Sequence, residues 1–93
     1  VSQSTFTNNQ AIAEKGGAIS TEGNLTIAQS TFTGNTAGSF GGAIASIIPA
    51  NSAGTPEVVI TNTSLIANRA NSGGAISHEL GTLTLDSSTI ANN

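Results

Sequence analysis

Hydrophobic residues recur along this chain in a fixed order and in register with asparagine. Four times an apolar residue is followed three positions later by Asn, in the pairs Phe6–Asn9, Phe32–Asn35, Leu65–Asn68 and Ile90–Asn93. The tetrapeptide Gly-Gly-Ala-Ile occurs three times, and its copies begin at Gly16, Gly41 and Gly73, which are 25 and 32 residues apart. A repeat of this length indicates structural units that stack on one another.

Each repeat is predicted to contain three short β-strands and no helix. Leu25 and Ile27 alternate with Thr26, which is the pattern of a half-buried strand. Phe32 follows Ile27 by five positions and breaks this alternation, so the backbone must bend near residues 28–30. The Gly-Gly-Ala-Ile copy supplies the third strand, and its glycines allow positive φ and a close backbone approach at a corner.

Strands repeated in register predict an all-β fold, a right-handed parallel β-helix of about 3.5 coils. The expected coils span residues 1–26, 27–59, 60–84 and 85–93 of one continuous segment. In-register pairing of successive coils stacks like residues above one another. We therefore expect apolar ladders inside and amide-to-amide bonds between asparagines at the turns. The expected ladders are Phe6, Phe32, Leu65 and Ile90; Ile19, Ile44 and Ile76; and Asn9, Asn35, Asn68 and Asn93.

The second repeat is longer than the others, and the excess lies in residues 47–56. This stretch contains Pro, Gly and Ser and is predicted to be a loop that leaves the coil. Insertions in repeat proteins often lie on the binding face, so the loop is the candidate recognition feature, with Ile47, Ile48, Pro49, Ala50, Asn51 and Pro56 as its residues. Phe40 has no counterpart in the other repeats, and it either covers a corner or is an exposed contact.

The two ends of such a stack would expose apolar columns and unpaired strand edges, which soluble proteins normally cap. Val1 itself falls in mid-repeat, in the column of Ile27, Ile60 and Leu85. We therefore expect that the natural molecule continues beyond both ends, or that copies stack end to end. The expected partners are other coils of the same or neighbouring chains, and a ligand on a host cell or other surface.

The composition excludes several classes of function. Charged residues make up 8% of the chain, the formal net charge is −3, and Lys15 and Arg69 are the two basic residues. Such a chain has no basic patch for nucleic acid or an anionic membrane. No run approaches the roughly 18 apolar residues of a membrane span, so we expect no direct membrane insertion of this segment. The absence of Cys excludes disulfides and thiolate metal sites.

The sequence contains no recognisable catalytic, metal or cofactor site, so neither an enzyme nor a bound cofactor is expected. Glycosidic cleavage needs two carboxylates roughly 5–10 Å apart, whereas the acidic residues are expected at different positions around the coil. They are Glu14, Glu22, Glu57, Glu79 and Asp86. His78, the one histidine, has no second ligand for a metal and is expected in a surface turn. The Gly-Gly pairs lack the Lys-Ser/Thr of a phosphate loop.

Gly-Gly-Ala-Ile paired with Phe-x-x-Asn resembles the chlamydial polymorphic outer membrane protein repeats. Phe6-Thr-Asn-Asn9 and Phe32-Thr-Gly-Asn35 fit the second motif fully, and Leu65 and Ile90 depart from it conservatively. The resemblance implies a β-helix passenger of an autotransporter, displayed on the bacterial cell surface and active in adhesion, with no catalytic residue. Two alternatives stay open: a subunit of a self-assembling extracellular filament, and a non-catalytic piece of a polysaccharide-acting β-helix enzyme.

Overall fold

The computed structural model describes residues 1–48 and 54–93, and their strands stack as a parallel β-helix. In chain order the first strands are β1 (Thr5–Thr7), β2 (Gln10–Ala11), β3 (Ile19–Thr21), β4 (Leu25–Ala28), β5 (Thr31–Thr33) and β6 (Thr36–Ala37). They are followed by β7 (Ile44–Ser46), β8 (Glu57–Thr61), β9 (Ser64–Ile66), β10 (Ile76–His78), β11 (Thr82–Asp86) and β12 (Thr89–Ala91).

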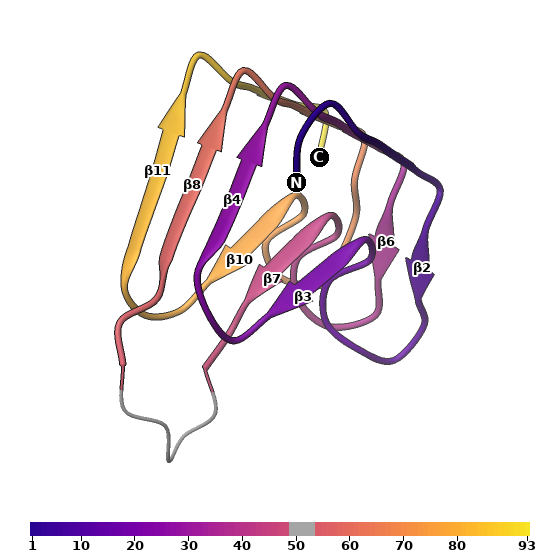
Figure 1. Cartoon of the computed structure of the whole chain (residues 1–93). Coiled ribbons are helices and arrows are strands. Elements are labelled where there is room, and N and C mark those ends of the chain that lie inside the picture. Colours follow the sequence, from indigo (N-terminus) through magenta and orange to yellow (C-terminus); the bar gives the residue numbers. More distant parts are fainter. Residues whose placement is uncertain (49–53) are drawn as a thin grey trace.

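Every sheet joins strands from successive coils, and every pairing is parallel. The sheet orders are β1-β5-β9-β12, β10-β7-β3, β11-β8-β4 and β2-β6, as Figure 1 shows for the last three. The register places like on like, so that Phe6 pairs with Phe32, Phe32 with Leu65, and Leu65 with Ile90. The predicted fold is thereby confirmed; its right-handed sense stays a prediction.

Each coil has a fourth side that the sequence did not predict. The short strands β2 and β6 pair between β1 and β3 in chain order, and Thr36 forms a further parallel bridge with Arg69. The expectation of three strands per coil is therefore wrong. A strand of two residues with only Ala11 or Ala37 facing inward has too little hydrophobic alternation to be recognised from sequence.

The interior is filled by the apolar ladders. Phe32, Ile44 and Leu65 are fully buried, and the Phe6 and Phe32 rings stack with centroids 4.6 Å apart. Burial of such a side chain contributes about 1.5–3 kcal/mol. The ladders lose their cover at the ends, where Ile90 is 46% exposed. The apolar columns of the sequence thus pair in register in the structure.

Residues with left-handed backbone turn the chain at the first glycine of each Gly-Gly turn and at two further corners, where most of them are not glycine. One column consists of Gln3, Gln29, Asn62 and Ser87, and the other of Asn8, Gly34, Ala67 and Asn92, all with φ between 46° and 66°. Gln29 lies within the predicted bend after Ile27. A left-handed residue turns the chain sharply from one sheet to the next within a single step. The strands on either side of the corner can therefore be short.

The asparagines expected to form a ladder lie beside the second of these corners. Asn35 and Asn68 are buried, and each accepts two hydrogen bonds at Oδ1 from the backbone N–H and the Nδ2 of the preceding member. Asn93 accepts the same pair from Asn68, at 2.7 and 3.0 Å. All these bonds point the same way, so the ladder has a polarity along the axis.

Candidate functional site

The insertion leaves the second coil after β7 and rejoins it before β8. We call the surface around its two stems the insertion corner, made of residues 22–24, 47–48, 54–57 and 79–81. Ile47 and Ile48 are 8% and 7% exposed, and Pro56 is also buried, so these three expected recognition residues pack in the stems. Pro49, Ala50 and Asn51 lie outside the described residues.

Hydrogen bonds hold the returning stem to the coils on either side of it. The backbone N–H of Glu57 donates to Asn24 Oδ1 at 2.8 Å, and the backbone N–H of Thr82 donates to the carbonyl of Pro56 at 3.1 Å. Glu57 also pairs in register with Thr82 at the start of β8 and β11. The stem is thus fixed by the same axial pairing that holds the coils together.

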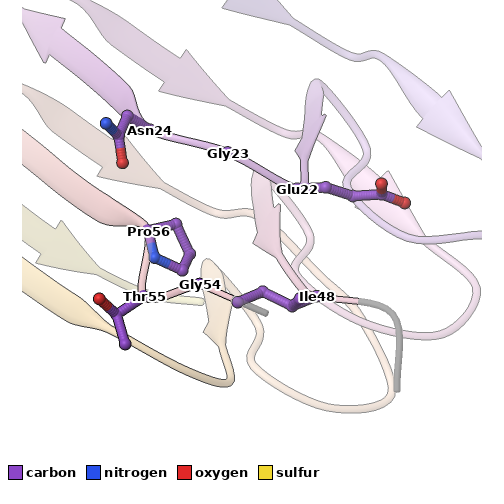
Figure 2. Close-up of a pocket in the computed structure, with 7 residues that line it drawn as sticks. All are labelled: Glu22, Gly23, Asn24, Ile48, Gly54, Thr55 and Pro56. Atoms are coloured by element: carbon purple, nitrogen blue, oxygen red, sulfur yellow. The ribbon is translucent and has the colours of Figure 1, made fainter. Parts of the chain in front are cut away.

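A hollow of about 370 Å³ lies between the first corner and the insertion. Figure 2 shows Asn24, Thr55 and Pro56 at one end of it and Glu22 and Ile48 at the other. Gly23 and Gly54 complete the lining, and a Cβ on Gly23 would meet no atom within 4 Å. The lining therefore combines apolar surface from Ile48 and Pro56 with polar residues, and the Glu22 carboxylate extends away from Asn24 and Pro56.

Three exposed carboxylates lie at this corner, one from each coil. Thr21, Ser46 and His78 are paired in register, so that Glu22, Ile47 and Glu79 follow them at the same position of successive coils. The expectation that the acidic residues lie at different positions around the coil is therefore wrong for Glu22 and Glu79, which flank Ile47 on either side. Glu57 joins them at the end of the insertion, and all three are exposed.

The carboxylates stand apart from one another. In the described part of the chain, no group of three His, Cys, Asp or Glu side chains could hold a metal ion. Glu22 and Glu79 are separated by two coils, about 9.6 Å along the axis at the usual strand spacing, with the Ile47 stem between them.

Buried polar atoms without partners adjoin the corner. Ser46 is fully buried and its Oγ has no hydrogen-bond partner, and the same holds for both ring nitrogens of His78. His78 is the last residue of β10 and half-buried, so the expectation of a surface turn residue is wrong. The strand continues through Ser77 and His78 because each pairs with β7.

The other residues singled out in the sequence have structural roles or lie apart from this corner. A Cβ on Gly17 would overlap the carbonyl oxygen of Gly42, and a Cβ on Gly42 that of Gly74, so the Gly-Gly turns stack where no side chain fits. Phe40 is 36% exposed and forms an isolated bridge with Ser72, which favours the exposed alternative.

Comparison with known families connects these repeats to a named one. Residues 3–22 and 29–47 match the Chlamydia polymorphic membrane protein repeat. Two stretches of the chain are therefore similar to this repeat. Each match runs from just before a Phe-x-x-Asn motif to just after a Gly-Gly-Ala-Ile motif, so it contains the two motifs that carry the resemblance.

The matches also mark where the chain departs from the repeat. The second match ends at Ile47, where the insertion begins, and the stretch with Leu65 in place of Phe lies outside both matches. The polymorphic membrane protein repeats belong to a family of surface and outer-membrane-associated proteins, which supports a cell-surface location in general terms. No curated protein and no solved structure matches the chain.

The described residues include no helix with the length and hydropathy needed to cross a bilayer.

Proposed function

We propose that this chain is a structural and adhesive segment of a bacterial cell-surface β-helix protein, of the autotransporter passenger type. The observation that carries the proposal is the match to polymorphic membrane protein repeats in a parallel β-helix. The stacked coils act as a rigid stalk, and the insertion corner acts as the recognition surface. The chain works without catalysis and without a cofactor.

The geometry that repeats from coil to coil supports a division of the chain into a stalk and a recognition surface. The asparagine ladder, the left-handed corners and the Gly-Gly turns repeat from coil to coil. The number of residues at the insertion corner differs between coils. Between the positions that pair in register on either side of it lie residues 22–24, 47–57 and 79–82 in successive coils. Variation confined to one corner is typical of repeat proteins that carry binding loops on one face.

The test is display of the chain on a non-adherent bacterium, followed by measurement of attachment to host cells. The matched variant replaces residues 47–57 by the three residues Glu22–Asn24 of the first corner, which shortens the insertion and keeps the coil register. We expect the intact chain to confer attachment and the shortened chain to lose most of it. Equal attachment by both would move recognition to the lateral sheets, and no attachment by either would refute an adhesive role.

End-to-end stacking of coils is the second proposal, and the polarity of the asparagine ladder favours it. In each described coil the backbone N–H of the ladder Asn donates to Oδ1 of the next member, so the N–H of Asn93 is oriented toward an acceptor such as Asn9 Oδ1 of a following coil. A hollow of about 460 Å³, lined by Arg69, Ala70, Gly74 and Asn93 among others, lies at this end.

The climb of the solenoid sets a geometric condition on how two copies of these residues could stack. Residues 1–9 have three successors along the axis, 27–35, 60–68 and 85–93, whereas residues 10–26 have two, 36–59 and 69–84. A second copy placed with its residues 1–9 over 85–93 would leave one layer over β10 unfilled. Light scattering and electron microscopy of the purified chain test this: regular fibres would show that copies join despite the gap, and a monomer would exclude the filament.

A further inference from the structure

The third Gly-Gly turn keeps a glycine where nothing in the described chain requires one. The second glycine of each turn is Gly17, Gly42 or Gly74, and none of the three has a positive φ. Gly17 and Gly42 are required sterically, because a Cβ on either would overlap the carbonyl oxygen of the turn in the next coil. A Cβ on Gly74 would come no closer than 3.0 Å to a described atom, the carbonyl carbon of Asn93. The overlap that demands glycine at the first two turns is therefore missing at the third.

Backbone donors on the same face of the third coil have no strand opposite them. The N–H groups of Gly41 and Gly42 donate to carbonyls of the third coil at 2.9 and 3.2 Å, and those of Ala43 and Ile44 do so at 2.8 and 3.0 Å. Residues 16–19 donate to the second coil in the same way. Residues 73–76 hold the same positions in the third coil, where β10 is the edge of its sheet among the described residues (Figure 1). Four consecutive N–H groups are thus left open along the axis.

A hollow and incomplete burial mark the same face. Ala43 and Ile44 are fully buried beneath the third coil, whereas Ile76, which pairs with Ile44, is half-buried. The hollow of about 460 Å³ lies beside the turn, with Gly74 and Asn93 in its lining. A further layer would bury Ile76 as the third coil buries Ile44, and burial of apolar surface favours such a contact.

We propose that this face of the third coil captures one extended segment of a partner chain, one layer thick, that contains a Gly-Gly-Ala-Ile turn. Addition of a strand to an open sheet edge is a common mode of recognition, in which main-chain hydrogen bonds supply the affinity. The interface continues the one between the second and third coils, with carbonyls of the partner accepting from residues 73–76. The turn gives specificity, because its carbonyl oxygen lies where a Cβ on Gly74 would be.

The partner is a single segment because a whole second copy, placed with its residues 1–9 over 85–93, leaves this layer unfilled. The captured segment is the partner of the coil stacking proposed above, on which the inference rests.

The test is binding of a synthetic peptide with the sequence of residues 11–24, which contains the first Gly-Gly turn. Amide hydrogen exchange of the purified chain, followed by NMR with and without about 1 mM peptide, reports the open donors directly. We expect slower exchange at residues 73–76 and no change at residues 41–44, which are already paired. The control peptide carries Gly16→Ala, whose Cβ would overlap the carbonyl oxygen of Ile19 and prevent the turn.

A substitution in the chain tests the role of the glycine. Gly74→Ala should weaken peptide binding at least about tenfold, equal to about 1.4 kcal/mol, because its Cβ would take the place of a carbonyl oxygen of the peptide. Gly23→Ala, where the added Cβ meets no atom, should bind the peptide as the wild type does. Far-UV circular dichroism of both variants should match the wild type, since neither Cβ overlaps a described atom.

The outcomes separate segment capture from end-to-end stacking of copies. Unchanged exchange at residues 73–76, or equal protection by the Gly16→Ala peptide, would overturn the inference. Wild-type peptide binding by Gly74→Ala would overturn it as well. Capture of the peptide by a chain that stays monomeric would support the inference and exclude the filament. Fibres of a chain that captures no peptide would overturn the inference and leave the stacking of copies standing.

Discussion

The side chain of Asn68 takes part in four hydrogen bonds at the centre of the asparagine ladder, and its replacement measures what the ladder contributes. Its Oδ1 accepts from the backbone N–H and the Nδ2 of Asn35, at 3.0 and 2.9 Å. Its Nδ2 donates to the carbonyl of Phe32 at 3.1 Å and to Asn93 Oδ1 at 3.0 Å. Asn68→Ala would leave the N–H of Asn35 and the carbonyl of Phe32 without these partners beside a fully buried core.

The expected loss is large compared with the stability of the fold. Each stranded buried group costs about 1–3 kcal/mol, so the two together cost about 4 kcal/mol. A chain of this length has a free energy of unfolding of about 5–14 kcal/mol. Asn9→Ala is the matched control, since exposed Asn9 loses one side-chain bond, Nδ2 to Asn35 Oδ1, and should cost about 0.5–1 kcal/mol.

Urea unfolding followed by far-UV circular dichroism gives both values, because the chain has no Trp or Tyr for fluorescence. A difference between Asn68→Ala and Asn9→Ala smaller than about 1 kcal/mol would refute the reasoning that burial within the ladder sets its contribution. The slope of the transition should be the same in both variants, so that the midpoints report stability directly.

Three further substitutions, one of them with a matched control, test other parts of the fold by the same unfolding assay. Ala67→Gly should stabilise the chain by about 0.5–1 kcal/mol, because Ala67 has φ 56° where its column otherwise uses Asn or Gly; a loss of stability would show that the left-handed corner is not strained. His78→Leu should raise the free energy of unfolding by about 1 kcal/mol or more, because it removes two buried nitrogens without hydrogen-bond partners. An unchanged value would mean that both ring nitrogens form hydrogen bonds in solution. Gly42→Ala should lower the free energy of unfolding by more than about 3 kcal/mol or prevent folding, because its Cβ would overlap the carbonyl oxygen of Gly74. In the control Gly23→Ala the added Cβ meets no atom, so its free energy of unfolding should lie within about 0.5 kcal/mol of the wild type.

The coils and ladders could be predicted because their signal is repeated. Phe6, Phe32, Leu65 and Ile90 occupy one column of the sequence and pair in one sheet of the structure. The spacing of Asn behind each of them predicted the ladder in the same way. The two-residue strands β2 and β6 were missed because a single inward alanine carries almost no hydrophobic contrast.

The insertion corner could be located but not described from sequence. The extra length of the second repeat predicted the loop, yet the burial of Ile47 and Ile48 depends on packing that no pattern encodes. The shared position of Glu22 and Glu79 was missed although a signal existed, since each follows the Ile of a Gly-Gly-Ala-Ile motif by three residues. Aligning on that isoleucine, and not only on the residue before Asn, brings the two acids into one column.

The physical constraints on the corners explain why recognition belongs at this one. Two corners of each coil depend on left-handed residues, and one adjoins the asparagine ladder while the other adjoins hydrogen bonds between Ser and Thr of successive coils. Inserted residues at either corner would break hydrogen bonds between coils. The Gly-Gly turn stacks so closely that even a methyl group would overlap the next coil. After β3 and β7 the chain meets none of these requirements, because the next strand starts from its own axial pairing, whereas after β10 Gly81 has φ 88° and a Cβ on it would overlap the carbonyl oxygen of Pro56. Sequence at this corner can therefore change in length and charge at little cost to the fold, which makes it the part of the coil where a binding surface can arise.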